Sequence, residues 1–186
     1  MEDNDIVDLY WERSETAISE TSKKYSRYCR FISFNILRNN EDAEECVNDT
    51  YLRAWNAMPP NRPNCLATFL GKITRNLSLD KFKKYNAEKR GLGQTELVLS
   101  ELDDCVPSSS TVEQDIAEKE LSEILNSFLE NLPKEKRIMF MQRYWYLMPI
   151  KEIAERSGES ESQVKSALFR TRNNLKTILE KEGVLL

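Results

Sequence analysis

The chain has 186 residues, of which 40% are hydrophobic and 31% charged, and its formal net charge is −4. This composition is ordinary for a folded soluble protein and excludes wholesale disorder. No apolar run approaches the length needed to cross a bilayer, the N-terminus is acidic where a signal peptide is basic, and histidine, the commonest general base, is absent. We therefore expect a cytoplasmic protein without membrane insertion that is not an enzyme.

The four cysteines are widely and irregularly spaced, without a CxxC pair. A zinc site needs clustered ligands, and a disulfide framework needs an oxidising compartment. We expect reduced, mostly buried thiols, no metal and no cofactor. The cysteines are Cys29, Cys46, Cys65 and Cys105.

The N-terminal third of the chain is predicted to be helical. Apolar residues recur near helical spacing from Ile6 to Leu37, which indicates two helices. Asn39-Asn40 then offers a break and an N-cap, and the acids that follow suit the first turn of a helix that runs through Trp55.

A proline-rich stretch, residues 59–64, follows this helix. Because proline lacks the backbone donor and clashes with the preceding turn, no helix crosses such a stretch, and we expect a stiff loop. A further helix begins near Leu66, has a basic outer face and ends near Arg90-Gly91.

Residues 92–112 differ in character, since they hold Gly93, Pro107, a run of three serines and scattered acids. Such a composition is typical of a linker. The chain shows no internal repeat and no strand-like alternation of useful length. The sequence therefore predicts an all-α fold of two small helical domains, residues 1–91 and 113–186, joined by a flexible acidic linker.

Helical periodicity resumes over residues 112–132, and another helix is predicted from Leu132-Pro133 through Trp145. The pattern after it is that of a helix-turn-helix. Pro149 to Gly158 predicts a short helix, because glycine suits the left-handed conformation that ends a helix before a tight turn. Ser160 and Gln163 then form a capping box. The buried stripe predicted for the last helix is Val164, Leu168, Leu175 and Leu179.

The predicted exposed face of this last helix mixes hydrogen-bonding groups that read bases with cations that bind phosphates. A plain helical hairpin that never touches DNA has the same spacing but does not explain this face. Because the N-terminal end of such a helix enters the major groove deepest, Gln163 and Ser166 are the predicted base readers. Charge is segregated along the chain, so the net charge of −4 does not argue against DNA binding. The residues predicted to contact duplex DNA are Ser162, Gln163, Lys165, Ser166, Arg170 and Arg172.

Two parts of the chain resemble bacterial sigma factors of the extracytoplasmic-function (ECF) group. Asp42–Trp55, followed after the loop by Phe69–Asp80, resembles sigma region 2, and Leu132–Leu175 resembles sigma region 4. The likeness covers nearly the whole chain, in the family's order and with its linker length. It implies a sigma factor that binds core RNA polymerase and directs promoter-specific transcription initiation.

The resemblance also implies a division of labour between the domains. The last helix would read the −35 promoter element, while the acidic, apolar helix over residues 42–55 would dock on a coiled coil of the polymerase's largest subunit. The docking residues implied are Asp42, Glu45, Asp49 and Leu52, of which the three carboxylates are expected to be exposed.

The helix from Leu66 to Arg90 would hold the −10 element as a separated strand, and the proline-rich loop would accept an unstacked base. Phe69 stands where the family often has tryptophan, and Leu66 where it has another aromatic residue. These departures preserve packing but leave the detail of base capture open. The residues implied for the −10 element are Asn61, Arg62, Lys72, Arg75, Asn76, Asp80, Lys83 and Lys84.

Two alternatives stay open at this point. One is a regulator that binds duplex DNA and never substitutes for sigma. The other is a helical enzyme, which the missing histidine and the lack of a nucleophile–base pattern disfavour. Because the ECF group usually has anti-sigma factors, we expect such a partner besides the polymerase and promoter DNA.

Overall fold

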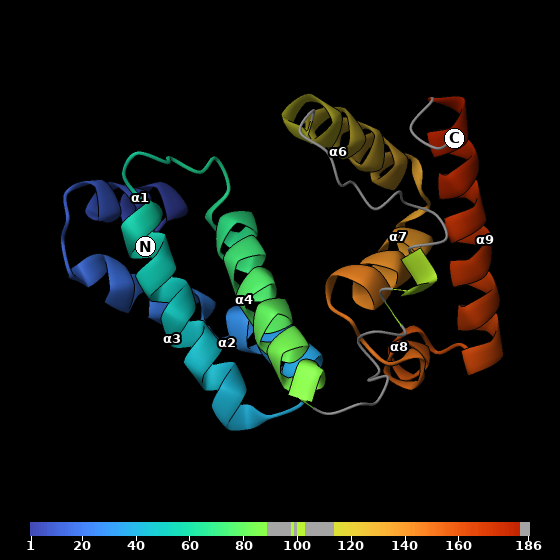
Figure 1. Ribbon diagram of the computed structural model, residues 1–186, viewed down its shortest axis with the longest axis horizontal. Coiled ribbons are helices and arrows are strands. Elements are labelled where there is room, and N and C mark those ends of the chain that lie inside the picture. Colours follow the sequence, from blue (N-terminus) through green and yellow to red (C-terminus); the bar gives the residue numbers. More distant parts are fainter. Residues whose placement is uncertain (89–97, 99, 103–113, 183–186) are drawn as a thin grey trace. The chain divides into compact units, whose positions relative to one another are not determined.

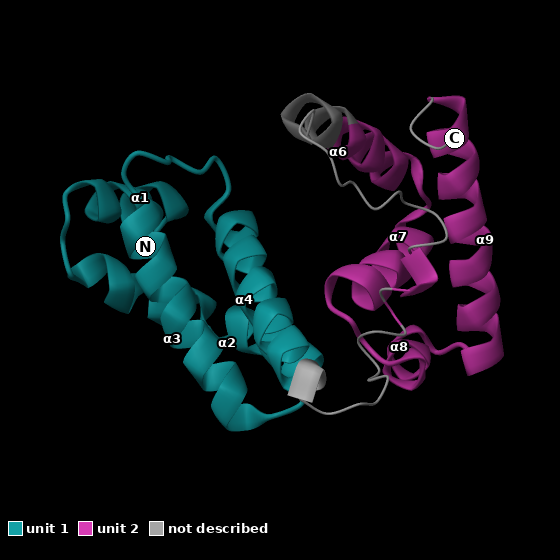
Figure 2. Cartoon of the chain, viewed as in Figure 1, with its two compact units in different colours: residues 1–91 teal, residues 92–186 magenta. Residues whose placement is uncertain are grey.

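The computed structural model of the chain describes residues 1–88, 98, 100–102 and 114–182. All regular elements in these ranges are helices (Figure 1), which confirms the predicted all-α class. Figure 2 colours the two units into which the chain divides, Met1–Gly91 and Leu92–Leu186. Cys105, the predicted helix end near Arg90 and most of the predicted linker lie outside the described residues.

The first unit is a four-helix assembly around one apolar core. Helices α2, α3 and α4 pack against one another in all three pairs, and α1 packs against α2. Tyr10 from α1, Ala54 from α3 and Leu70 from α4 are completely buried in this core. The elements are α1 (Asp3–Trp11), α2 (Thr16–Leu37), α3 (Asn40–Ala57) and α4 (Leu66–Glu88).

The predicted boundaries within this unit are confirmed. The periodic stretch from Ile6 to Leu37 forms two helices, α1 and α2. Asn39 is the N-cap of α3, and its side-chain oxygen accepts a hydrogen bond from the backbone N–H of Asp42 at 3.1 Å. The proline-rich residues 59–64 connect α3 to α4 without forming a helix. The loop therefore lies between the helix to which the resemblance assigns polymerase docking and the helix to which it assigns the −10 element.

A seam of hydroxyl groups runs through the centre of the first unit. Thr50 of α3 contacts Thr74 of α4 (Oγ1–Oγ1 3.0 Å), and Ser78 of α4 donates to Ser33 of α2 (2.9 Å). All four side chains are buried. Thr50, Thr74 and Ser78 also bond to the carbonyl four residues earlier in their own helices, so polar groups within the core of this unit have partners both within and between helices.

The second unit consists of α6 (Gln114–Asn131), α7 (Lys134–Phe140), a π-helical turn η1 (Met141–Trp145), α8 (Ile150–Ser157) and α9 (Glu161–Lys181). The long α9 packs against both α7 and α8. The single helix predicted through Trp145 is thus interrupted by η1, and both Arg143 and Tyr144 of this turn are buried.

Part of the predicted linker belongs structurally to the second unit. Residues 98 and 100–102 are helical, Val98 is fully buried, and Glu101 forms ion pairs with Arg143 and Arg172. The acidic composition of the stretch therefore did not reveal a segment that packs on the second unit.

The helix-turn-helix forms as predicted. Gly158 ends α8 with a φ of 72°, in the left-handed region that favours glycine. Ser160 caps α9 by accepting a hydrogen bond from the backbone N–H of Gln163 at 3.3 Å. The predicted stripe of Val164, Leu168, Leu175 and Leu179 is buried throughout, joined by Thr171.

Replacement of Gly158 by alanine should destabilise the second unit by about 1–2 kcal/mol, because a Cβ atom strains the left-handed backbone. Apart from Gly158 and its two neighbours in the chain, no heavy atom lies within 4 Å of the position that this Cβ would occupy, so the cost is one of backbone conformation alone. Gly158→Asn should cost less, since asparagine tolerates this region. Thermal unfolding followed by circular dichroism gives the order; equal losses for the two variants would contradict it.

Candidate nucleic-acid interface and docking surface

The N-terminal half of α9 presents a polar and basic surface to solvent. Ser162, Lys165, Ser166 and Arg170 are all exposed, as predicted from the sequence. Arg170 donates from Nε to the backbone carbonyl of Ser166 at 3.2 Å, which directs its guanidinium along this surface. Lys165 lies 4.0 Å from Glu161, and both side chains are more than half exposed, so this ion pair holds the cation only weakly.

Gln163 is exposed but already has a structural role. Its side-chain oxygen accepts hydrogen bonds from both the backbone N–H and the hydroxyl of Ser160, each at 2.8 Å. The capping box therefore occupies the acceptor of this amide and leaves its NH₂ group for a base edge. A bidentate contact from Gln163 to an adenine would require the cap to open.

The predicted exposed position of Arg172 is wrong. Its side chain is 18% exposed, and it donates to the Tyr144 hydroxyl (2.5 Å) and to Glu101 (3.3 Å). Residue 172 follows Leu168 by four positions and precedes Leu175 by three, which places it at the edge of the buried stripe. A contact of Arg172 with DNA would require the side chain to leave these partners.

A second polar surface lies along one face of α4 in the first unit. The exposed residues along it are spaced by four, four and three positions, so they share one face of the helix. Arg75 is only half-buried rather than exposed, and its burial lowers the pKa of its guanidinium. The exposed residues of this face are Lys72, Asn76, Asp80 and Lys83, with Lys84 exposed at its edge.

The loop before α4 carries Asn61 and Arg62, both exposed as predicted. Arg62 forms an ion pair with Asp8 of α1, and its guanidinium lies 5.7 Å from the centre of the Trp11 ring. Sequence reasoning missed the part of α1 in holding this loop, since 54 positions separate Asp8 from Arg62.

The cysteines differ in their environments. Cys29 and Cys46 are buried, as expected, but Cys65 is exposed directly before α4. A hydrogen bond from the Thr68 hydroxyl, together with backbone N–H groups at the helix start, lowers the pKa of the Cys65 thiol. Burial raises the pKa of Cys29 and of Cys46.

The predicted docking residues on α3 divide into two pairs. Asp42 and Glu45 both bind the ammonium of Lys81 on α4, at 2.8 and 2.6 Å. The expectation that Asp42 is exposed is wrong, because its side chain is only 20% exposed. Asp49 is exposed, and Leu52, at 56%, is among the most exposed large apolar residues of the described chain. Glu45 is exposed as predicted, at 67%, but it is bound to Lys81, so Asp49 and Leu52 are the stronger candidates for contact with a partner.

Lys81→Met should remove a pH-dependent part of the stability of the first unit. The hydrogen bond from Lys81 is the main cause that lowers the pKa of Asp42 from its ordinary 3.8. A carboxyl whose pKa is lower in the folded than in the unfolded state stabilises the fold at pH values above its unfolded-state pKa. This stabilisation is lost as the pH falls through the lower pKa of the folded state. The variant should therefore lose up to about 1 kcal/mol at pH 7, and its difference from wild type should narrow below pH 3.8.

Urea unfolding at a series of pH values measures this difference. Lys72→Met, which removes an exposed cation from the same helix, is the matched control and should show no such narrowing. A difference between Lys81→Met and wild type that stays constant down to acid unfolding would contradict the assignment.

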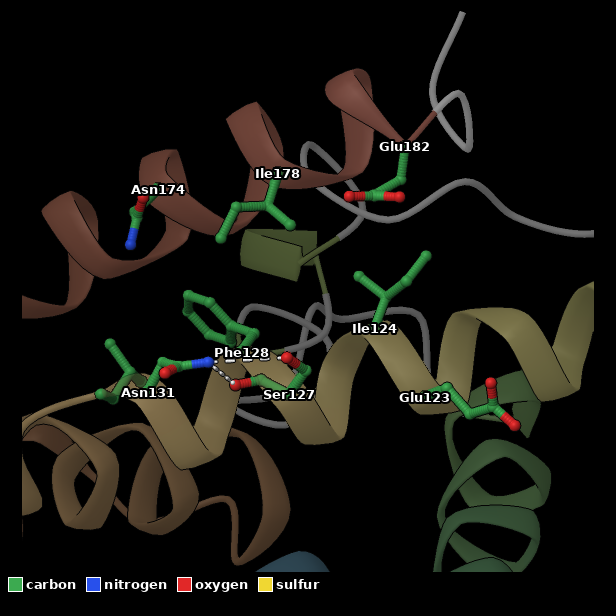
Figure 3. A pocket seen from close by; sticks show the side chains of 9 residues that line it. Glu123, Ile124, Ser127, Phe128, Asn131, Asn174, Ile178 and Glu182 are labelled. Carbon is green, nitrogen blue, oxygen red and sulfur yellow. Dashed lines mark hydrogen bonds between the residues drawn. The ribbon is translucent and has the colours of Figure 1, made fainter.

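The second unit also contains a groove of about 300 Å³ between α6 and the C-terminal half of α9. Figure 3 shows Phe128 and Ile178 facing each other across it, with the Asn131 amide donating to Ser127 on the α6 side. The groove lies beyond Asn173 along α9, so it does not extend the polar surface around Ser166 and Arg170.

Within the described ranges, no helix combines the length and apolar character that a membrane span requires.

Comparison with known families matches both units. Residues 22–88 match the family described as Sigma-70 region 2, and residues 122–175 match Sigma-70, region 4. The first match contains α3, the proline-rich loop and α4. The second contains the helix-turn-helix with the part of α9 up to Leu175, which includes exposed Lys165, Ser166 and Arg170.

Two curated relatives have the same description. The chain is 25% identical over 152 residues to the ECF RNA polymerase sigma factor SigE of Mycolicibacterium smegmatis. These residues cover 82% of this chain and 57% of that protein. It is 24% identical over 151 residues to the ECF RNA polymerase sigma factor SigM of Bacillus subtilis, 80% of this chain and 86% of that protein. The chain thus spans little more than half of the first relative and most of the second. Taken together with the two family matches, these likenesses show that the chain belongs to the ECF group of the sigma-70 family of sigma factors.

Proposed function

We propose that this chain binds core RNA polymerase and directs it to specific promoters, with α9 as the reader of the −35 element and α4 with its preceding loop as the site of the −10 element. The observation that carries the proposal is the exposed cluster of Lys165, Ser166 and Arg170 on the second helix of a capped helix-turn-helix. This face has the chemistry that the major groove requires, and the family provides the context in which it acts.

The −35 element would be read as duplex DNA. Ser166 and the amide NH₂ of Gln163 lie in the first two turns of α9, the part that enters the groove deepest. Lys165 and Arg170 provide the charge that binds phosphates, and arginine also forms bidentate contacts with guanine. Ser162 completes the set at the first turn of the helix.

The −10 element would be held as a single strand by the first unit. Lys72 and Lys83 on the exposed face of α4 are placed to follow a sugar–phosphate backbone, and Asn76 between them has the donors and acceptor that a base edge needs. Asn61 and Arg62 in the loop would receive an unstacked base. Because opening a base pair costs a few kcal/mol, capture of the flipped base would favour melting without ATP.

Docking on the polymerase would use α3. Exposed Asp49 and Leu52 combine a negative charge with an apolar side chain, which suits a partner that is basic and partly apolar. The basic surfaces can contact DNA, but the acidic segments that give the chain its net charge of −4 should keep its affinity for DNA low in the absence of polymerase. Polymerase would present the two promoter-reading surfaces together. We also expect a cytoplasmic location and an anti-sigma partner that restrains this activity.

Run-off transcription with purified core polymerase on a genomic fragment library tests the proposal. Added chain should yield promoter-specific transcripts, and the promoters recovered should share elements near −35 and −10. If a second sigma factor shows the core to be active and this chain yields no specific transcript, the proposal fails. Footprinting on DNA alone combined with that failure would favour a regulator that never substitutes for sigma.

A further inference from the structure

A carboxylate from the predicted linker lies at the centre of a cluster that the proposed function does not use. Glu101 accepts hydrogen bonds from Arg143 (Nη2–Oε1 2.5 Å), Tyr144 (Oη–Oε2 3.0 Å) and Arg172 (Nη1–Oε2 3.3 Å). Arg172 also donates to the Tyr144 hydroxyl at 2.5 Å, which closes a ring of hydrogen bonds. The helical residues around Glu101, the turn η1 and α9 therefore meet at one carboxylate.

Burial makes this carboxylate necessary. The side chain of Arg143 is only 7% exposed, and its Nη1 is bound to the Met148 carbonyl at 3.0 Å. A buried guanidinium without a counter-charge is strongly unfavourable, and Glu101 is the acid that forms ion pairs with both Arg143 and Arg172 in the described part of the chain. Val98, three residues before Glu101, is fully buried and anchors the segment.

Arg172 connects the cluster to α9. This residue is held by the ion pair to Glu101 and by the hydrogen bond to the Tyr144 hydroxyl, and its guanidinium lies 6.0 Å from the centre of the Tyr144 ring. Ser166 and Lys165 lie only six and seven residues earlier on α9, about 9 and 10.5 Å along its axis. Any rotation or tilt that the cluster prevents would otherwise displace the residues that face the groove.

We propose that Glu101 is a positioning residue for −35 recognition, which acts through Arg172 and Arg143 and not on the DNA itself. This inference rests on the proposed role of α9 as the −35 reader. It extends the DNA-binding unit into the stretch predicted as linker, and it assigns Arg172 to the support of α9 in place of a phosphate contact.

The experiment measures promoter binding by polymerase holoenzyme carrying wild-type or variant chain. The two probes are a promoter recovered by the run-off experiment and the same fragment with its −35 element scrambled. Glu101→Gln should lower the affinity for the intact promoter about tenfold, in the range typical of residues in one network, and leave the affinity for the scrambled probe unchanged. The salt dependence of binding should not change, because no phosphate contact is lost.

Control variants separate positioning from other effects. Glu123→Gln removes the same charge from an exposed site of the same unit and should affect neither probe. Arg172→Gln should give the same selective loss, and the double variant Glu101→Gln/Arg172→Gln should be no weaker than either single one. Tyr144→Phe keeps both ion pairs and should give a smaller loss of the same kind, which provides a test even if Glu101→Gln unfolds the unit.

Three results would overturn the inference. Equal losses on both probes would show that Glu101 only maintains the fold. A gain in affinity with a steeper salt dependence would show that Glu101 holds back a DNA-binding Arg172. Unchanged binding would show that the cluster does not reach the −35 reader. If wild-type holoenzyme itself does not distinguish the two probes, the proposed function of α9 fails instead.

Discussion

Leu52→Lys should weaken binding of the chain to core RNA polymerase about thirtyfold or more, as is typical of a central apolar contact in an interface. Leu52 is 56% exposed on α3, so its replacement leaves the core of the first unit intact. The substitution removes an apolar contact and places a cation where Asp49 indicates a basic partner. Leu52→Ala removes the apolar contact alone and should lie between wild type and Leu52→Lys.

The measurement is titration of fluorescently labelled core polymerase, combined with thermal unfolding of each variant. Ser19→Lys adds the same charge at an exposed position on α2 and should bind as wild type does. If Leu52→Lys unfolds like wild type and still binds core polymerase with unchanged affinity, α3 does not dock through this residue. That result would not affect the two promoter-reading surfaces.

The features predicted correctly from the sequence depend on neighbours in the chain. Gly158 and Ser160 mark the turn of the helix-turn-helix, because left-handed backbone and N-capping are properties of one or two residues. The buried stripe of α9 depends only on helical spacing, and so does the shared exposed face of Lys72 and Asn76 on α4. Family likeness added the order of the two regions but no side-chain partners.

The features that were missed depend on pairs of residues distant in the chain. Glu101 and Arg172 are 71 positions apart, and Glu45 is 36 positions from Lys81. Composition placed Glu101 in a linker, and the family resemblance made Glu45 an exposed docking charge. Neither a charge pattern nor a family motif identifies the partner that folding brings to a charge. Helical spacing alone was enough to place Arg172 beside Leu168 and Leu175, yet its charge suggested DNA.

Arg170→Ala should weaken binding of holoenzyme to a promoter with an intact −35 element by about 1–3 kcal/mol, and should reduce the slope of log affinity against log salt by roughly 0.9. Arg170 is exposed on the same surface as Ser166, and its hydrogen bond to the Ser166 carbonyl leaves the guanidinium's terminal nitrogens for DNA. Competition binding over a salt series yields both quantities from one set of titrations.

Lys181→Ala is the matched control for this substitution. It removes one exposed cation from the same helix, but about 16 Å further along the axis and in its last turn. The slope of log affinity against log salt should be the same for Lys181→Ala as for wild type. The slope for Arg172→Gln should also equal that of wild type if Arg172 supports α9 and does not contact DNA. A slope for Arg170→Ala indistinguishable from that of Lys181→Ala would mean that Arg170 contacts no phosphate. A loss of affinity without a change of slope would leave Arg170 as a base reader alone. The salt slope therefore distinguishes Arg170 from Arg172, two residues with the same charge that lie two positions apart on α9.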